Sequence, residues 1–550
     1  MAGAITTGPA DVGLRREMGL IGAICSSETA IIGSGWLFGA WYAAAAAGTA
    51  AILGWAIGGA AIIILALVHA ELGGMYPVAG GTARFPHFAF GSIAGISFGF
   101  FSWVPALMVA PVEAFAVMGY AQYYWHGLYN RTTSNVTGLG FGMSITLMAI
   151  FTVINFLAMR AFNRVNSTIT VWKVAIPVLA IIVLFSQFRS GNFGSHGGFL
   201  PYGTKALFAA IPSAGIIFAY LGFEGADQLA GEVRNPQRNV PLGIIGAIGI
   251  GTVIYILLQV VFIGALRPSE LARGWPGLAS DTGLGTGPLA SLAGVVGLGW
   301  LAVILRVDAF ISPSGTGLIA VTGTSRIGYG LARNRYYPQL FARVDKRGVP
   351  WFSLILTFLL GLVFLLPFPS WHSLVSLVTL AAVLMYAGAP LALGAFRRQA
   401  PEANRPYRLP GAAVIAPFAF IIANMLIYWS GLEVIWKLGI VLVIGYVLTG
   451  IFMAFDKQRP PLKWKAAAWL PAWLIGMGGI SWQGQYSGGA VKAPVNTGNL
   501  PFWWDMLAVA GFGLIIYYWA QVSRLPRGEM MELVSRQAAP QPEPAGTPGS

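Results

Sequence analysis

The chain has 550 residues, of which 56% are hydrophobic and 9% are charged, and its net charge is +14. So few charges in so apolar a chain exclude a soluble globular domain and indicate a polytopic membrane protein. The single cysteine, Cys25, excludes an internal disulfide, and one cysteine with five scattered histidines disfavours a metal site.

A membrane-spanning helix needs about 20 apolar residues, and the apolar segments of this chain predict an all-α protein with about fourteen spans. These segments are residues 18–47, 50–71, 92–125, 141–159, 168–188, 206–231, 241–266, 290–330, 350–368, 371–396, 409–430, 434–455, 466–482 and 502–522. Residues 1–17 precede them as an N-terminal segment, and residues 524–550, which are polar and rich in Pro, are expected to be a disordered tail.

Basic residues are distributed unequally between the two sides of this predicted topology. Most of the 33 Lys and Arg residues fall on the side that holds both chain termini. By the positive-inside rule, we expect a multi-pass protein of the cytoplasmic membrane with both termini in the cytoplasm. This topology, with attraction to anionic membrane lipid, accounts for the positive charge without a nucleic acid partner.

The first apolar segment is interrupted by Gly33, Ser34 and Gly35. Glycine is a poor residue for a helix interior, so we expect the helix to break here. A break at membrane depth is tolerated where the freed backbone groups line a cavity, and there its N–H and carbonyl groups can bind an anion and a cation. Close packing of another helix on the two glycines explains this motif equally well when it is taken alone.

Three further motifs resemble one transporter family. Residues 71–91 read ELGGMYPVAGGTARFPHFAFG. Directly after an interrupted first segment, this string resembles the amino acid–polyamine–organocation (APC) family. A second match joins residues 218–227, FAYLGFEGAD, to residues 232–241, EVRNPQRNVP, and a third lies in residues 324–350.

The resemblance implies the fold. APC members have the LeuT-like architecture, in which two five-helix halves are related by an inverted repeat and spans 1 and 6 are broken around the substrate. Residues 18–455 would form the transporter core of twelve spans. Residues 456–523 would add two further spans at the C-terminal end.

The resemblance also implies a substrate site at the two breaks. The substrate carboxylate would bind N–H groups of the first break, and its ammonium group would meet carbonyls near Ile31 and Leu221. Phe218 would contact the substrate side chain. The implied substrate-binding residues are Ile31, Gly33, Ser34, Gly35, Trp36, Phe218, Leu221, Gly222 and Phe223.

Lys173 lies inside the predicted span of residues 168–188. Burial disfavours its charged form, so this side chain can take up and release a proton. Snorkelling to the interface is the alternative, but about 13 Å of helix separate Lys173 from Arg164 near the loop. Proton-coupled APC members carry a lysine here, so the resemblance implies that Lys173 couples transport to protons, with Glu224 as a pH-sensitive link between the second break and neighbouring helices.

Other candidate site residues are polar groups inside predicted spans. The resemblance places Ser314 and Thr316 near Lys173. Glu113 and Asp308 are costly carboxyls at membrane depth, which indicates function by default. A structural hydrogen bond between helices explains Glu113 equally well. Asp308 could pair with Arg306 or Lys173, or contact the substrate ammonium group.

Together these features predict a secondary active transporter that imports an amino acid by proton symport with alternating access. The sequence contains no phosphate-binding G-x-x-x-x-G-K-[ST] loop, so an ion or exchange gradient would supply the energy. The alternative is an amino acid or polyamine exchanger without proton coupling. A membrane enzyme would need clustered catalytic groups, a channel would leave the two breaks unexplained, and only an uptake assay separates a transporter from a nutrient sensor.

No cofactor or metal is expected, and the oligomeric state and the transported amino acid stay open. The sequence around Glu113 and Ser314 resembles that of proton-coupled aspartate carriers, but this does not decide the substrate.

Overall fold

The computed structural model describes residues 18–77, 81–130, 135–157, 159–279, 284, 287–345, 348–366, 370–455, 461–487 and 496–538. Most of these residues are helical. The longest helices are α3 (Ala51–Met75), α5 (Ser92–Ala121), α6 (Gly138–Leu157), α7 (Met159–Phe185), α11 (Pro236–Ala265), α13 (Gly299–Arg333), α15 (Trp371–Gln399), α16 (Ala412–Trp429), α17 (Leu432–Phe455) and α20 (Trp504–Ser523).

Shorter elements connect or extend these helices. The shorter α-helices are α1 (Leu20–Ile31), α2 (Gly35–Ala47), α4 (Gly81–Phe90), α8 (Gly203–Ser213), α9 (Ile216–Tyr220), α10 (Gly225–Gln228), α12 (Pro288–Val295), α14 (Trp351–Leu365), α18 (Trp464–Ala467), α19 (Trp469–Gln483) and α21 (Arg527–Ala538). The 3-10 helices are η1 (Gly48–Ala50), η2 (Ser190–Phe193), η3 (Ala230–Glu232), η4 (Trp275–Leu278) and η5 (Gln339–Ala342). Two short strands, β1 (Tyr129–Asn130) and β2 (Asn135–Val136), pair antiparallel.

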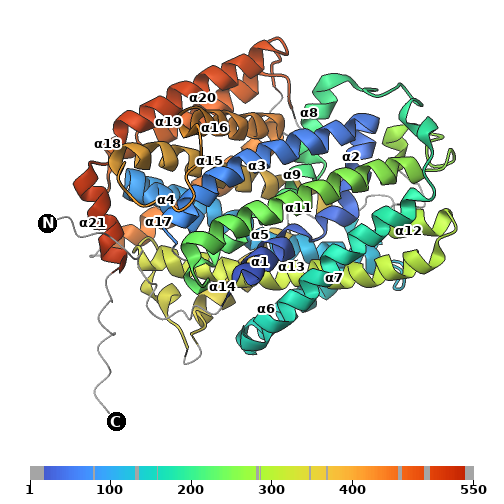
Figure 1. Ribbon diagram of the computed structural model, residues 1–550, viewed down its shortest axis with the longest axis horizontal. Coiled ribbons are helices and arrows are strands. Elements are labelled where there is room, and N and C mark those ends of the chain that lie inside the picture. Colours follow the sequence, from blue (N-terminus) through green and yellow to red (C-terminus); the bar gives the residue numbers. More distant parts are fainter. Residues whose placement is uncertain are drawn as a thin grey trace.

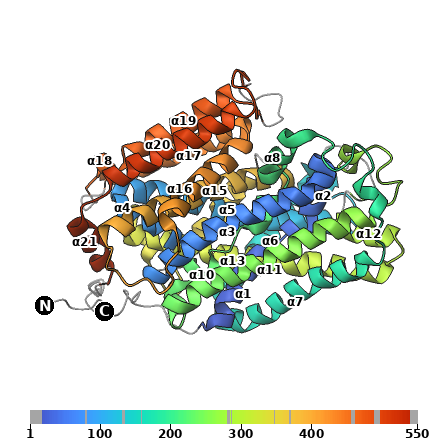
Figure 2. The ribbon, with the colours of Figure 1, turned by 45° about the horizontal axis from the view of Figure 1, so that its top comes forward.

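The long helices lie side by side in one bundle (Figure 1). α5 packs against α4, α13 and α15, and α5 and α15 are the most deeply buried of the long apolar helices. α19 and α20 lie at one edge of the bundle and α7 at the opposite edge (Figures 1 and 2). In both views α4, α18 and α21 gather at one end of the bundle, whereas α2, α8 and α12 lie at the other.

Both predicted helix breaks are present. α1 ends at Ile31 and α2 begins at Gly35. In the sixth segment, α8, α9 and α10 follow one another with interruptions, and Gly215 and Gly222 take φ angles of +86° and +105° there. Glycine alone adopts such angles without strain, so these two positions explain where the helix stops.

Each of the fourteen predicted segments contains helix. Among the described residues, ten helical stretches are long and apolar enough to cross a membrane, and the first of them joins α2, η1 and α3 over Gly35–Met75. The sixth segment is broken into short pieces, and α14 and α19 have 15 residues each. The chain is therefore a multi-pass helical membrane protein, while the number fourteen and the inverted repeat stay predictions.

The start expected at residue 290 for the eighth span is wrong, because the structure has a short helix, α12, before the long helix α13, which is the candidate span in this segment. Gly297 lies between them with a φ angle of +87°. A residue in this left-handed conformation ends a helix, so α13 begins anew at Gly299.

The expected disorder of residues 524–550 is also wrong for residues 527–538, which form α21. Met530 is fully buried, and Met531, Leu533 and Val534 pack beside it at helical spacing. The Pro-rich composition of the rest of the tail concealed this apolar stripe. The expectations for residues 1–17 and 539–550 lie outside the described residues.

Truncation of one apolar side chain should release α21. Met530→Ala removes the buried anchor of this helix and should cost about 2 kcal/mol of local stability, which would raise amide hydrogen exchange over residues 527–538. Lys463→Ala is the control, because it removes only the ion pair between Lys463 and Glu529. The two side chains are 41% and 42% exposed, so this pair contributes less than about 1 kcal/mol. Equal protection of α21 in both variants would contradict the anchoring role of Met530.

Candidate functional site

Side chains from other helices bind the carbonyl groups that are freed at the end of α1. Lys173 Nζ and Thr316 Oγ1 both donate to the Thr29 carbonyl, over 2.6 and 2.7 Å. The Tyr255 hydroxyl donates to the Ile31 carbonyl over 2.8 Å. The first break is therefore held by α7, α11 and α13, which satisfies backbone groups that lipid could not.

A carboxylate binds the other side of the same break. The Ser34 N–H donates to Oε2 of Glu113 over 2.9 Å, and Trp371 Nε1 donates to Ser34 Oγ over 2.8 Å. Glu113 is fully buried in α5. The N–H of Ser34, which we expected to bind a substrate carboxylate, thus holds the protein's own carboxylate and lies under Trp371.

The two glycines of the first break have different surroundings. A Cβ atom at Gly35 would lie 2.7 Å from the Cα of Ala219, so helix packing explains this glycine. A Cβ atom at Gly33 would lie 2.6 Å from Glu113 Oε1 and 2.9 Å from Thr316 Oγ1. Gly33 therefore brings backbone next to the polar groups of α5 and α13.

Glu224 organises the second break. Its Oε2 accepts the Gly222 N–H over 3.1 Å and the Tyr386 hydroxyl over 2.6 Å, which links the unwound segment to α15. Ser27 Oγ of α1 donates to the Phe223 carbonyl over 2.9 Å. α1 is thus joined directly to the second break, so a shift of α1 would be transmitted to that break.

Lys173 is fully buried and points to the first break rather than to the membrane interface. Besides the Thr29 carbonyl, its Nζ donates to Thr316 Oγ1 over 2.8 Å. The carboxylates of Glu113, Asp308 and Glu28 lie close enough to interact with the ammonium charge. One buried lysine therefore interacts with three carboxyl groups.

Asp308 is held by residues next to this cluster. It accepts hydrogen bonds from Trp172 Nε1 and Ser312 Oγ, each over 2.8 Å. Arg306 instead lies 3.6 Å from the centre of the Tyr123 ring. Asp308 thus contacts the helix of Lys173 through Trp172, and Arg306 stacks on an aromatic ring.

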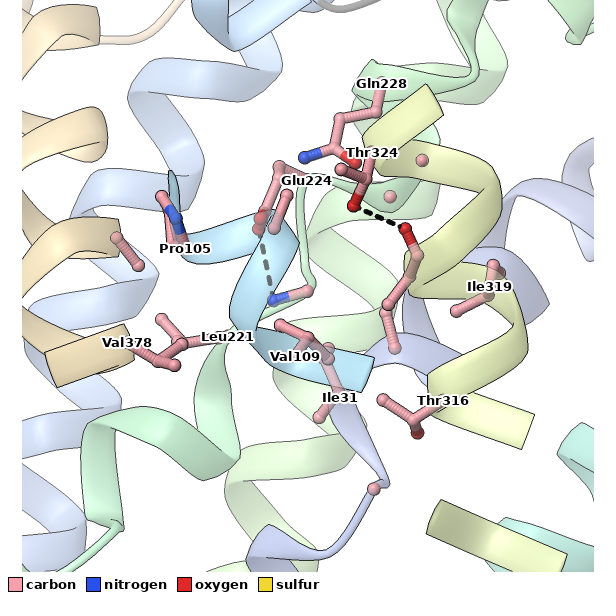
Figure 3. Close-up of a pocket in the computed structure, with 18 of the residues that line it drawn as sticks. Ile31, Pro105, Val109, Leu221, Glu224, Gln228, Thr316, Ile319, Thr324 and Val378 are labelled. Carbon is pink, nitrogen blue, oxygen red and sulfur yellow. Dashed lines mark hydrogen bonds between the residues drawn. The ribbon is translucent and has the colours of Figure 1, made fainter. Parts of the chain in front are cut away.

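A pocket lies between the two breaks and is completed by α5, α13 and α15 (Figure 3). Several residues predicted for the site line it, and they are Ile31, Gly33, Glu113, Phe218, Leu221, Gly222, Glu224 and Thr316. The other predicted residues lie outside the lining, and they are Ser34, Gly35, Trp36, Lys173, Phe223, Asp308 and Ser314. The Phe223 ring, for example, packs against His69 and Tyr386, at 5.3 and 4.7 Å between ring centres.

Four polar lining residues were not predicted: Ser26, Ser102, Gln228 and Thr324. Ser102 precedes Glu113 by three helical turns, and Thr324 follows Thr316 by about two. Helical spacing from the two predicted residues therefore contained the signal for these two. Gln228, the last residue of α10, lies four residues beyond Glu224.

Trp371 was also missed. Its ring packs against Phe38 at 4.9 Å, Phe218 at 5.8 Å and Tyr42 at 5.5 Å between ring centres. Phe38 and Tyr42 belong to α2, which lies at the end of the bundle opposite to α4. This aromatic cluster separates the pocket from that end of the molecule.

The chain is similar to known amino acid transporters along most of its length. A family model described as amino acid permease matches residues 18–452. The glutamate/serine transporter AimA of Bacillus subtilis (strain 168) is 34% identical over 516 residues, which cover 92% of this chain and 94% of AimA. The aspartate–proton symporter of the same organism is 36% identical over 523 residues, which cover 93% and 97%. The branched-chain amino acid permease BcaP, also of this organism, is 24% identical over 465 residues, which cover 82% and 95%.

Proposed function

The chain belongs to the amino acid permease family of the APC transporters, and we propose that it imports an amino acid across the cytoplasmic membrane by proton symport with alternating access. The relatives at 34% and 36% identity are named as amino acid transporters, and one of them is named as a proton symporter. Both names support a transporter rather than an enzyme. The case for proton coupling in this chain depends on Lys173.

The observation that carries the proposal is the bond from Lys173 Nζ to the Thr29 carbonyl, 2.6 Å long and fully buried. A charge-assisted hydrogen bond is about twice as strong as a neutral one. Loss of the Lys173 proton would therefore loosen the end of α1. Ile31, two residues further on, lines the pocket, so the protonation state of Lys173 would alter the substrate site.

Two residues connect the proton site with the pocket. Thr316 lines the pocket, accepts a hydrogen bond from Lys173 and donates one to the Thr29 carbonyl. Glu113 also lines the pocket, interacts with the charge of Lys173 and holds the Ser34 N–H. Substrate binding at these residues would therefore change the electrostatic environment of Lys173. Proton binding at Lys173 would in turn change the environment of Thr316 and Glu113.

The direction of the pocket supports an inward-facing state. Its lining runs from Gly33 towards Gln228 and Thr324, near the end of α13 that carries Arg326 and Arg333. Arg and Lys mark the cytoplasmic side of a membrane protein. Trp371 would then form part of the closed outer gate, and alternating access would require its release from Ser34.

Trp371→Phe should weaken this gate. Phenylalanine keeps an aromatic ring, although a smaller one, but the bond to Ser34 Oγ is lost, which costs roughly 1 kcal/mol and should raise the outward-facing fraction roughly fivefold. Val378 lines the pocket. A cysteine introduced at this position in a Cys25→Ser background should be labelled faster from outside when the outward-facing fraction rises. Ser34→Ala should have the same effect, and the double variant should add nothing more. Unchanged labelling in both single variants would contradict the gate.

Uptake by the purified protein in proteoliposomes tests the proposed function. A thermal-shift screen against the twenty amino acids identifies the ligand, because a ligand that binds the native state raises the unfolding midpoint. An imposed inward proton gradient should then drive accumulation of that amino acid above its outside concentration. Exchange without accumulation would contradict proton symport and indicate an exchanger. Binding without any uptake would indicate a sensor.

A further inference from the structure

Each hydroxyl group that lines the pocket already donates a hydrogen bond within the protein. Each donates to a backbone carbonyl of the protein over 2.7–2.9 Å, and the pairs are Ser26 with Ala23, Ser102 with Phe98, Thr316 with Thr29, and Thr324 with Ala320. A hydroxyl group has one proton to donate and two lone pairs. These four side chains can therefore only accept hydrogen bonds from a ligand.

The ionisable groups of the lining are carboxyl groups. Glu113 and Glu224 line the pocket, and none of the described lining residues is Lys, Arg or His. Oε1 of Glu113 is buried and has no hydrogen-bond partner among the described residues, although Oε2 holds the Ser34 N–H. When ionised, the Glu113 carboxyl group only accepts hydrogen bonds, and when protonated, it offers a single proton. In neither state does it supply a positive charge.

Lys173 does not offset the acidic groups around the pocket. Its Nζ lies behind Thr316, outside the lining, and it donates to Thr316 and to the Thr29 carbonyl. Three carboxylates, those of Glu28, Glu113 and Asp308, interact with its one positive charge. The surroundings of the pocket therefore carry more potential negative than positive charge.

We infer, on the premise that the proposed amino acid transport is correct, that the substrate has an uncharged side chain that donates hydrogen bonds, a hydroxyl or a carboxamide, and is not an acidic amino acid. A side-chain carboxylate would bring a second negative charge to a lining that holds two carboxyl groups and no Lys, Arg or His. Buried without a cationic partner, it would lose its hydration without adequate compensation.

A hydroxyl or carboxamide fits the same lining. Its protons can satisfy Glu113 Oε1 or the lone pairs of the lining hydroxyl groups. Gln228, whose amide both donates and accepts, can pair with either group. Much of the remaining lining is apolar, including Val109, Ile319 and Val378, and burial of a full positive charge there would also be costly.

Isosteric ligand pairs test this inference on the purified full-length protein. Binding of asparagine, aspartate, glutamine, glutamate, serine and lysine is measured by calorimetry at pH 7, where the acidic side chains are ionised. Asparagine should bind at least tenfold more tightly than aspartate, and glutamine at least tenfold more tightly than glutamate. Shape is matched within each pair, so the ratio isolates the charge and the loss of donors.

A reversed charge in the lining provides the second arm. Gln228→Lys adds a cation, and it should raise the affinity for aspartate relative to asparagine at least tenfold compared with Gln228→Met, the uncharged control of similar size. Aspartate or lysine binding as tightly as asparagine in the unmodified protein would overturn the inference and leave amino acid transport standing. Absence of binding by all of the twenty amino acids would instead remove the proposed function itself.

Discussion

In proteoliposomes, Lys173→Ala is expected to abolish accumulation driven by a proton gradient while substrate exchange stays measurable. The variant removes the buried cation that donates to the Thr29 carbonyl and to Thr316. The geometry of the first break would then no longer depend on a proton. Exchange needs only the pocket and the motion of the helices, so it separates loss of coupling from loss of folding. Uptake of labelled substrate is measured with and without the gradient.

Two further variants sharpen this test. Lys173→Gln keeps a hydrogen-bond donor of similar length but cannot take up a proton, so it should retain more thermal stability than Lys173→Ala and show the same loss of accumulation. Lys437→Ala is the control, because this lysine is 43% exposed and pairs with Glu433 at the surface. Full gradient-driven uptake by Lys173→Gln would refute the coupling role of Lys173.

The sequence was sufficient to predict the features that depend on local composition. Long apolar runs give the helices, and Gly33 and Gly35 give the first break, because glycine is unfavourable inside a helix. The second break was implied by the family resemblance of residues 218–227. The split between α12 and α13 was accessible in principle, since Gly294 lies just before it and Gly297 lies in it. It was missed because the apolar run continues through both glycines.

Features that depend on tertiary contacts could not be predicted in this way. The Ser34 N–H is an obvious anion-binding group in the sequence, but only packing places Glu113 against it. Tyr255 lies 224 residues from the Ile31 carbonyl to which its hydroxyl donates. Trp371 looks like the first residue of an ordinary span until its bond to Ser34 is seen. In each case the partner comes from a distant helix whose rotation about its axis the sequence does not determine.

Gly222→Ala is expected to eliminate transport and to lower the unfolding midpoint more than any surface substitution. The residue takes a φ angle of +105°, which strains any residue with a side chain. The added Cβ would also lie 2.5 Å from the Cβ and 2.7 Å from the backbone carbon of Ala30. α1 cannot readily move away, because its neighbouring carbonyls are held by Lys173 and Tyr255. Strain and overpacking together should cost on the order of 3 kcal/mol.

Gly249→Ala is the matched control for this variant. Gly249 lies inside α11, with no atom within 4 Å of the added Cβ, so alanine should be neutral or slightly stabilising there. Thermal unfolding and substrate uptake are measured for both proteins. If Gly222→Ala unfolded at the same temperature as Gly249→Ala and transported equally well, the close contact between the two breaks would not be needed for the transport cycle. A lowered midpoint with normal uptake would confine the role of Gly222 to stability.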